Sequence, residues 1–155
     1  MLPDDWTAVA EIYRKGIATG NATFEKEVPS WEFWDRAHIK SCRIVAEAGE
    51  VVAGWAALSQ VSARSVYAGV AEVSVYVSEN YMGQRVGTSL LEALVKDSEK
   101  EGFWTLQASI FPENTASLRL HKNIGFREMG YREKIGKMDG KWRDTILLER
   151  RSKIN

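Results

Sequence analysis

The spacing of apolar residues predicts a helix close to the N-terminus. Apolar side chains recur every three or four residues after Asp4 and Asp5, which can cap a helix, and Gly16 and Gly20 mark its end. The apolar positions of this helix are Trp6, Val9, Ala10, Tyr13 and Ile17. A second, shorter helix is predicted after Ser30, which can cap it. Its apolar residues are Trp31, Trp34 and Ile39.

Two runs of strand-forming residues follow and predict a β-hairpin. The runs cover residues 43–48 and 51–58, and Gly49-Glu50 lies between them. Glycine at the first central position suits a two-residue hairpin turn, because that position needs a positive φ.

The run "VAEVSVYV" at residues 70–77 alternates strictly between apolar and polar or aromatic residues, as a half-buried strand does. Its apolar face holds Ala71, Val73, Val75 and Val77, and its other face holds Glu72, Ser74 and Tyr76. An ordinary solvated sheet face would give the same alternation. The strand continues without a break into a turn and a further helix, which favours a functional reading of its polar face.

That helix carries an apolar stripe and ends at Gly102, and residues 103–110 form the next predicted strand. The stripe consists of Leu90, Leu91, Leu94 and Val95. A strand, helix and strand in this order imply a crossover and parallel pairing. A short helix over residues 115–123 and closing strands over 126–134 and 145–149 complete the prediction. The fold class is α/β, or α+β, with one central mixed sheet.

Composition narrows the classes of partner. The chain has 155 residues, enough for one domain, and we expect residues 1–155 to form it. Its 21 basic residues balance its 21 acidic ones, which argues against nucleic acid and membrane surfaces as partners and favours a small neutral or zwitterionic molecule. The single cysteine, Cys42, is interpreted as a strand residue rather than a nucleophile, and a cytoplasmic location is expected. No metal site is predicted.

The turn "SENYMGQRVGTS" can bind an anion. A loop that leaves a strand and starts a helix near Gly83 and Gly87 exposes unpaired amide groups at the positive end of the helix dipole. Thr88 and Ser89 can add hydroxyl donors. Many ordinary turns hold two glycines, and the nucleotide-binding patterns GxGxxG and GxxxxGK[ST] are both absent.

Two motifs in combination are more specific. "YVSENYMGQRVG" and "PENTASLRLHKNIGF" resemble the Gcn5-related N-acetyltransferase (GNAT) family, in particular its phosphinothricin and methionine sulfoximine acetyltransferase branch. The resemblance extends over nearly the whole chain, from "AEIY" and "ATFE" to "GKWRD". It implies a twisted, splayed mixed sheet flanked by helices, and acetyl-coenzyme A (acetyl-CoA) bound where the sheet opens beside Glu72.

The resemblance also implies roles for individual residues. Main-chain groups of Val75, Tyr76 and Val77 pair with the pantetheine arm, Asn114 contacts the arm from the opposite strand, and Ser117 lies with His121 at the thioester end. The diphosphate is expected on the loop formed by Gly83, Gln84, Arg85, Val86, Gly87 and Thr88.

The chain departs from the family pattern at two places. Arg85 stands where the family usually has glycine, and its side chain either obstructs the cofactor or turns outward and adds a charge-assisted contact to it. We expect the outward orientation. The family's first strand normally precedes the helix that begins here after Asp4-Asp5, and only three residues remain for it.

Acetylation of an amine requires a proton acceptor, donors for a developing oxyanion and a proton for the departing thiolate. Glu72 is the candidate base, the backbone amide of Val75 a candidate oxyanion donor, and His121 a candidate general acid, although a lone helical histidine is often structural. Arg64 is the candidate for binding a substrate carboxylate, or else an ordinary exposed arginine. The other candidate substrate contacts are Phe24, Val73 and Ser74. Lys141, Trp142 and Asp144 match a late motif of the branch, which we interpret as structural or related to a homodimer.

The sequence therefore predicts an acetyl-CoA-dependent N-acetyltransferase that acts on the α-amine of a small amino acid or analogue, such as phosphinothricin, methionine sulfoximine or methionine sulfone. Acetylation of a protein N-terminus or a polyamine is the nearest enzymatic alternative. A sensor domain that binds acyl-CoA without turnover is an alternative from another class; Glu72 argues against it and Arg85 for it.

Overall fold

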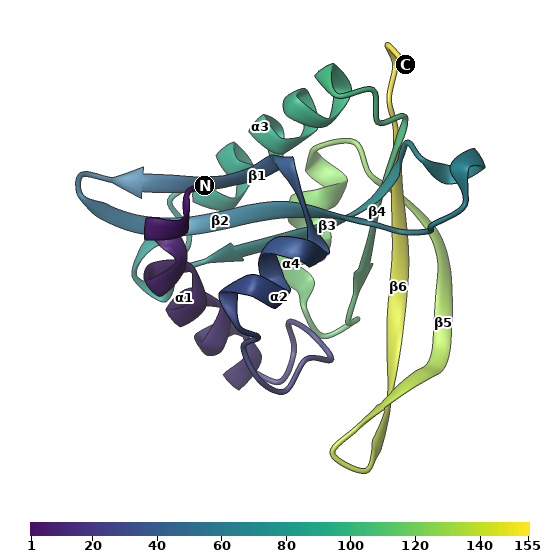
Figure 1. Ribbon diagram of the computed structural model, residues 1–155. Helices are drawn as coiled ribbons and strands as arrows, with labels where there is room; N and C mark the ends of the chain where they lie inside the picture. The colour runs from purple at the N-terminus through teal and green to yellow at the C-terminus, as the bar shows by residue number, and fades with distance from the viewer.

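The computed structural model describes residues 1–155, which form one six-stranded mixed sheet flanked by helices (Figure 1). The strand order is β1-β2-β3-β4-β6-β5. The elements are η1 (Pro3–Asp5), α1 (Trp6–Ala18), α2 (Trp31–Ala37), β1 (His38–Ala48), β2 (Val51–Gln60), η2 (Ser65–Tyr67), β3 (Val70–Val77), η3 (Glu79–Tyr81), α3 (Val86–Lys100), β4 (Thr105–Ile110), α4 (Thr115–Asn123), β5 (Arg127–Met138) and β6 (Lys141–Arg151). The predicted fold class is confirmed.

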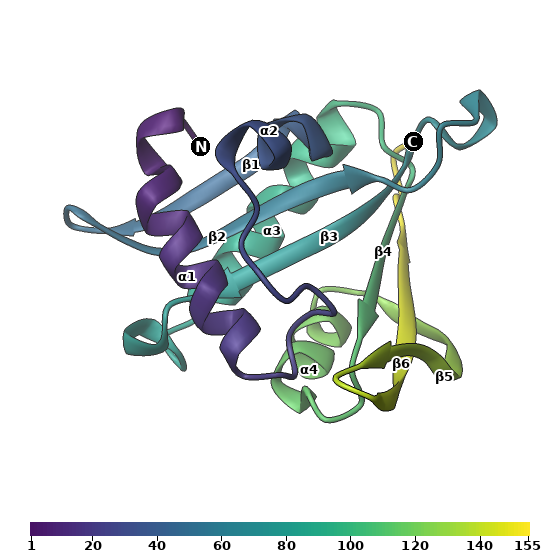
Figure 2. The same ribbon diagram turned by 60° about the horizontal axis from the view of Figure 1, so that its bottom comes forward.

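One parallel pair interrupts the otherwise antiparallel sheet. β3 and β4 are parallel, as the strand, helix and strand order predicted, and they pair over only three residues, ending at Glu72 opposite Gln107. Beyond that point the two strands diverge, as Figure 2 shows. The remaining residues of β3 still pair with β2 on the other side. The sheet therefore opens along the second half of β3.

Helices cover both faces of the sheet beside β2. Helix α3 packs on one face, where Leu90, Leu91 and Leu94 are fully or almost fully buried in the larger apolar core. Helices α1 and α2 cover the other face, where Trp34 and Trp55 belong to a second core. Burial on both faces explains why the sequence of β2 is continuously apolar rather than alternating.

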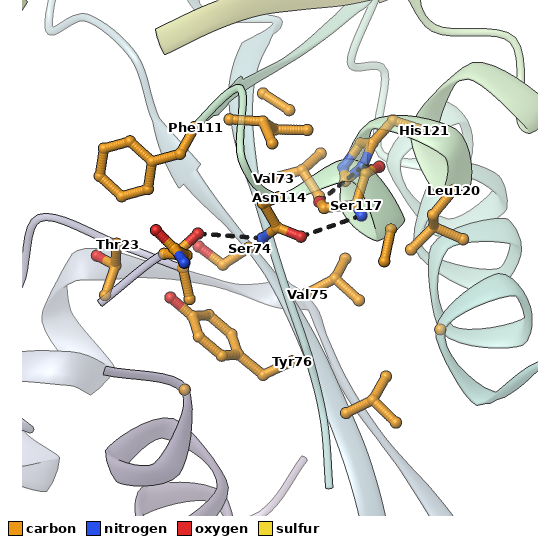
Figure 3. A pocket seen from close by; sticks show the side chains of 18 of the residues that line it. Thr23, Val73, Ser74, Val75, Tyr76, Phe111, Asn114, Ser117, Leu120 and His121 are labelled. Carbon is orange, nitrogen blue, oxygen red and sulfur yellow. Dashed lines mark hydrogen bonds between the residues drawn. The ribbon is translucent and has the colours of Figure 1, made fainter. Parts of the chain in front are cut away.

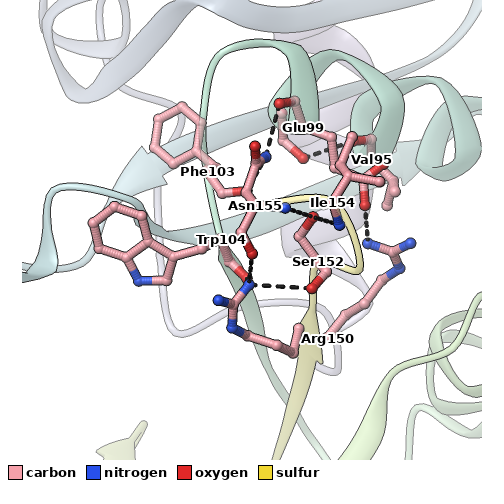
Figure 4. A network of polar contacts seen from close by, with 10 residues as sticks. Val95, Glu99, Phe103, Trp104, Arg150, Ser152, Ile154 and Asn155 are labelled. Carbon is pink, nitrogen blue, oxygen red and sulfur yellow. Dashed lines mark hydrogen bonds and ion pairs between the residues drawn. The ribbon is translucent and has the colours of Figure 1, made fainter.

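The C-terminal residues bind the end of α3 and the segment before β4 (Figure 4). Arg150 forms an ion pair of 2.9 Å with Glu99 of α3, and both side chains are largely buried. The Asn155 side-chain amide donates to the carbonyl oxygens of Glu99 and Phe103, at 2.8 and 3.3 Å. These contacts join the end of α3, the segment before β4 and the C-terminal end of the chain after β6.

The structure confirms the hairpin turn at Gly49-Glu50 and changes two other expectations. Ala48 pairs with Val51, and Gly49 has a φ of 65°. Ile39 was wrongly placed in the second helix: α2 ends at Ala37, and Ile39 lies in β1. The two closing strands are longer than expected and form a continuous hairpin, so residues 141–144 belong to β6.

Two further observations bear on the sequence predictions. Cys42 is completely buried in the larger core, and burial raises the pKa of its thiol, as expected for a packing residue rather than a nucleophile.

Residues 3–5 form η1 directly before α1, so the first strand of the sheet is β1, which follows α2. No helix combines the length and apolar character needed to span a bilayer.

Candidate active site

A groove of about 1130 Å³ lies where β3 and β4 diverge. Figure 3 shows its walls: Val73, Ser74, Val75 and Tyr76 of β3 on one side, and Ser117, Leu120 and His121 of α4 on the other. The loop after α1 and the loop before α3 also line it. The groove brings together every predicted site residue except Gln84 and Arg64.

The two exceptions have identifiable contacts elsewhere. The side-chain amide of Gln84 donates to the carbonyl oxygen of Asn80 at 3.1 Å, within the loop itself. Arg64 is exposed in the loop between β2 and β3, with its guanidinium 5.6 Å from the ring centroid of Tyr67. Arg64, the predicted carboxylate-binding residue, therefore does not line the groove in the single chain.

The loop before α3 has the geometry of an anion site. The first amide groups of this 15-residue helix have no acceptor within the helix and lie at the positive end of its dipole. Gly83 has a φ of 76° and nothing within 4 Å of where a Cβ would stand, so the backbone is accessible there. At Gly87 a Cβ would come within 3.2 Å of the Leu120 side chain, so this glycine lets α3 approach α4 closely.

Arg85 adopts the left-handed conformation, with a φ of 64°, immediately before the first residue of α3. Glycine adopts this conformation freely, whereas for another residue the conformation costs about 1–2 kcal/mol of free energy. Arg85 therefore takes a backbone conformation that glycine adopts more easily, and adds an exposed cation that lines the groove.

His121 is buried, with 3% of its surface exposed, and a hydrogen bond within α4 fixes the orientation of its ring. Nδ1 lies 2.8 Å from the carbonyl oxygen of Ser117, one turn earlier. Since a carbonyl oxygen only accepts, Nδ1 carries the proton, and Nε2 has no hydrogen-bond partner in the protein. Burial lowers the pKa of His121, which favours the neutral ring. In this state Nε2 accepts a proton, and it can act as an acid only after it has received one.

Glu72 lies at the point where the strands separate. Its Oε2 accepts a hydrogen bond of 2.9 Å from the side-chain amide of Gln107. Glu72 is partly exposed and lines the groove, so its carboxylate can reach a bound substrate. A carboxylate and a neutral imidazole with a free nitrogen thus line the same groove, and both can accept protons.

Tyr76 belongs to the apolar packing rather than to proton chemistry. Its ring stacks on Trp55 of β2 with 4.7 Å between ring centroids. The ring of Tyr13, which belongs to α1, also packs against it, with 4.9 Å between centroids. Burial raises the pKa of the Tyr76 phenol far above its usual range, so it remains neutral. The contribution expected of Tyr76 to cofactor binding must therefore come from its main chain.

The loop after α1, which lines the groove, is held in place by Arg143, a residue that the sequence did not indicate, and by Asn114. Arg143 donates to the carbonyl oxygen of Gly20 at 2.8 Å and to Oδ1 of Asn21 at 2.9 Å, and its guanidinium lies 4.1 Å from the ring centroid of Phe111. The side-chain amide of Asn114 caps α4 by accepting from the Ser117 amide, and it also donates to the Asn21 carbonyl oxygen. Together these contacts fix the loop after α1 along the groove.

Thr145, which the sequence did not indicate, and Phe24 also line the groove. Thr145 is 3% exposed, its hydroxyl has no hydrogen-bond partner, and it lines the groove. The Phe24 ring meets Phe111 edge-on with 4.8 Å between centroids. Strand alternation places Arg143 on the same face of β6 as Thr145, but its partners on a distant loop carry no sequence signal.

Comparison with known proteins agrees with this geometry. A sequence model described as "Acetyltransferase (GNAT) family" matches residues 6–126. The phosphinothricin N-acetyltransferase of Alcaligenes faecalis is 35% identical over 95% of this chain and 78% of its own length. The L-methionine sulfoximine/L-methionine sulfone acetyltransferase of Pseudomonas paraeruginosa is 29% identical over 94% of this chain and 88% of its own.

Solved structures agree as well. The phosphinothricin acetyltransferase of Sinorhizobium meliloti in complex with acetyl-CoA superimposes with a TM-score of 0.86 at 29% identity, covering 97% of this chain and 85% of that one. The matched sequence, the splayed sheet and the loop before α3 all lead to the same assignment: the chain belongs to the GNAT acetyltransferase family.

Proposed function

We propose that this protein transfers the acetyl group of acetyl-CoA to the α-amine of a small amino acid or analogue of the phosphinothricin, methionine sulfoximine or methionine sulfone type. The observation that carries the proposal is the divergence of β3 from β4 directly after Glu72, which leaves the main chain of β3 accessible beside two proton acceptors. The names of the relatives at 29–35% identity support the substrate class.

The groove's residues fit acetyl-CoA. Main-chain groups of Val75, Tyr76 and Val77 bind the pantetheine arm, and the free amides from Gly83 to Thr88 bind the diphosphate. Asn114 and Ser117 contact the arm from the other wall. Two buried polar atoms without partners, His121 Nε2 and Thr145 Oγ1, belong to side chains that line this groove, which is the expected arrangement where a ligand supplies the missing hydrogen bonds.

When bound, acetyl-CoA supplies an activated acetyl thioester. Glu72 takes the proton of the incoming amine, directly or through water, and the backbone amide of Val75 donates to the carbonyl oxygen as negative charge develops on it. His121 accepts at Nε2 the second proton of the attacking nitrogen and gives it to the sulfur as the carbon–sulfur bond breaks. Because the resting imidazole is neutral, the acid role predicted for His121 becomes the second half of a proton relay.

An α-amine is the easier acceptor for this site. The reference pKa of a peptide α-amino group is about 8, so its deprotonation at neutral pH costs about 1 kcal/mol, against about 4 to 5 kcal/mol for a lysine-like amine with a pKa of about 10.4. The pKa of a free amino acid's amine lies between these two values, because the neighbouring carboxylate stabilises the ammonium form. Phe24, Val73 and Ser74 border the acceptor side. Arg64 binds the substrate carboxylate only if its loop approaches a bound substrate, and its exposed position allows this.

An assay of thiol release over a panel of amines tests the proposal. The panel contains phosphinothricin, methionine sulfoximine, methionine sulfone, their carboxamide derivatives, a polyamine and an N-terminal peptide. We expect release with the amino acids and a higher KM for the carboxamides. Fastest release with the polyamine or the peptide would select that alternative, and acetyl-CoA binding without release on any amine would identify a sensor domain.

Exchange of Arg85 for glycine is expected to weaken acetyl-CoA binding roughly 3- to 10-fold, because an exposed charge-assisted contact contributes about 1 kcal/mol. The difference should shrink as salt is added. Calorimetry on wild type, Arg85→Gly and Arg85→Lys measures it, with the lysine variant retaining both the charge and the left-handed backbone. If Arg85→Gly binds acetyl-CoA more tightly than wild type, the arginine obstructs the cofactor instead.

We also propose that the protein forms a homodimer and is cytoplasmic, as expected from the sequence. The hairpin of β5 and β6 exposes four large apolar side chains, Met129, Tyr131, Ile135 and Trp142, each more than 40% exposed. Asp144 supports the hairpin internally, since it accepts from the Tyr131 hydroxyl and the Lys134 amide. We expect light scattering to give twice the chain mass; a monomer at all concentrations would contradict the dimer.

A further inference from the structure

The carboxylate of Glu72 has one hydrogen-bond partner in the protein, and this partner comes from the strand that diverges from its own. The side-chain amide of Gln107 donates to Glu72 Oε2 at 2.9 Å. In the β3–β4 ladder, Val70 pairs with Thr105, Ala71 with Leu106 and Glu72 with Gln107, and the pairing ends there. The side-chain bond therefore spans the last pair before the strands separate.

The two side chains lie on the same face of the sheet, since Ala71 and Leu106, the preceding pair, are both buried in the core on the opposite face. Glu72 lines the large groove, and Gln107 does not. Gln107 instead lines a second hollow of about 450 Å³, together with Tyr67, Thr105 and Glu149. The Glu72–Gln107 pair thus lies at the boundary between the two hollows.

We propose that Gln107 is the positioning residue for the catalytic carboxylate, an inference that rests on the proposed function. A primary amide donates through its nitrogen, so Gln107 fixes Oε2 and leaves Oε1 with no partner in the protein, free for the incoming amine. The amide is also neutral. A lysine or arginine in its place would stabilise the negative charge of the carboxylate and weaken it as a base, whereas a neutral donor orients it with a smaller effect of this kind.

Replacement of Gln107 by leucine, which has a similar size and no donor, is expected to lower kcat roughly 10-fold, the size of effect expected for one hydrogen bond to a charged group. The KM for acetyl-CoA should change by no more than about two-fold, because Gln107 lies outside the cofactor groove. Thr105→Val is the matched control: Thr105 lies two residues earlier on the same strand and in the same hollow, and its side chain forms no hydrogen bond with Glu72.

Two further variants separate positioning from packing. In a Glu72→Gln background, Gln107→Leu should cause no additional loss, because Gln107 acts through Glu72. Gln107→Met retains the length of the side chain and has no donor, so its kcat should fall about as far as that of Gln107→Leu. Melting temperatures of all variants verify that they are folded.

Wild-type kcat in Gln107→Leu, or an equal loss in the Glu72→Gln background, would overturn the positioning role while leaving the proposed reaction intact. Wild-type kcat in Gln107→Met would also overturn it, since that result would show a requirement for size and not for a donor. A wild-type protein that acetylates no amine would overturn the proposed function itself, and with it this inference.

Discussion

Exchange of Glu72 for glutamine is expected to lower kcat/KM for amine acetylation on the order of 10²-fold or more, because it removes the proton acceptor and changes little else. Glutamine has the same shape, and its carbonyl oxygen can still accept the hydrogen bond that Gln107 donates to Glu72. The closed end of the β3–β4 pair should therefore be retained.

Steady-state assays with phosphinothricin and methionine sulfone measure this loss, and calorimetry with acetyl-CoA is the control. We expect the Kd for acetyl-CoA to stay within about two-fold of wild type, since main-chain groups make most of the proposed contacts. Full activity in Glu72→Gln would remove Glu72 from the mechanism. A large loss of acetyl-CoA binding would show that Glu72 supports the groove rather than the chemistry.

Exchange of His121 for asparagine is expected to lower kcat on the order of 10²-fold, because it removes the proton acceptor at Nε2. The asparagine amide can still donate to the Ser117 carbonyl oxygen, as Nδ1 does in the wild type. The variant therefore separates the proposed relay from the helix contact. Unchanged kcat in a folded variant would contradict the relay.

The pH dependence of activity and of stability offers a second test of the state of His121. Burial lowers the pKa of this imidazole, so the active neutral form persists to a pH below 6.5, the usual value for histidine. The unfolded chain binds this proton more readily than the folded one, so stability is retained above about pH 6.5 and decreases as the pH falls below it. His121→Asn should flatten this decrease, and His38, whose pKa is lowered in the same way, should account for part of what remains.

Local patterns in the sequence predicted the elements that build the groove. The alternation in residues 70–77 correctly placed Glu72 on the face opposite the core, and the crossover predicted the parallel pair that ends at Glu72. The glycine-containing turn predicted a helix start with accessible amides, and Arg85, which stands before that start, has a left-handed backbone conformation of the kind that glycine favours.

Contacts between distant segments could not be predicted in this way. Gln107 meets Glu72 only because of the register between strands 35 residues apart, and Arg143 meets Gly20 across 123 residues. The length of the β5–β6 hairpin was underestimated because β5 is almost entirely exposed, so its sequence lacks the apolar alternation that marks a half-buried strand. Ile39 was misplaced because a short helix passes directly into a strand, with no glycine or proline at the junction.

A crystal structure of the protein with bound acetyl-CoA tests the central claim most directly. The account predicts the pantetheine arm along Val75 to Val77 between the diverging strands, the diphosphate on the loop from Gly83 to Thr88, and the thioester carbonyl oxygen at the Val75 amide, within reach of Glu72 and His121. A cofactor bound outside this groove, or a loop before α3 filled by the Arg85 guanidinium while the diphosphate lies elsewhere, would contradict it.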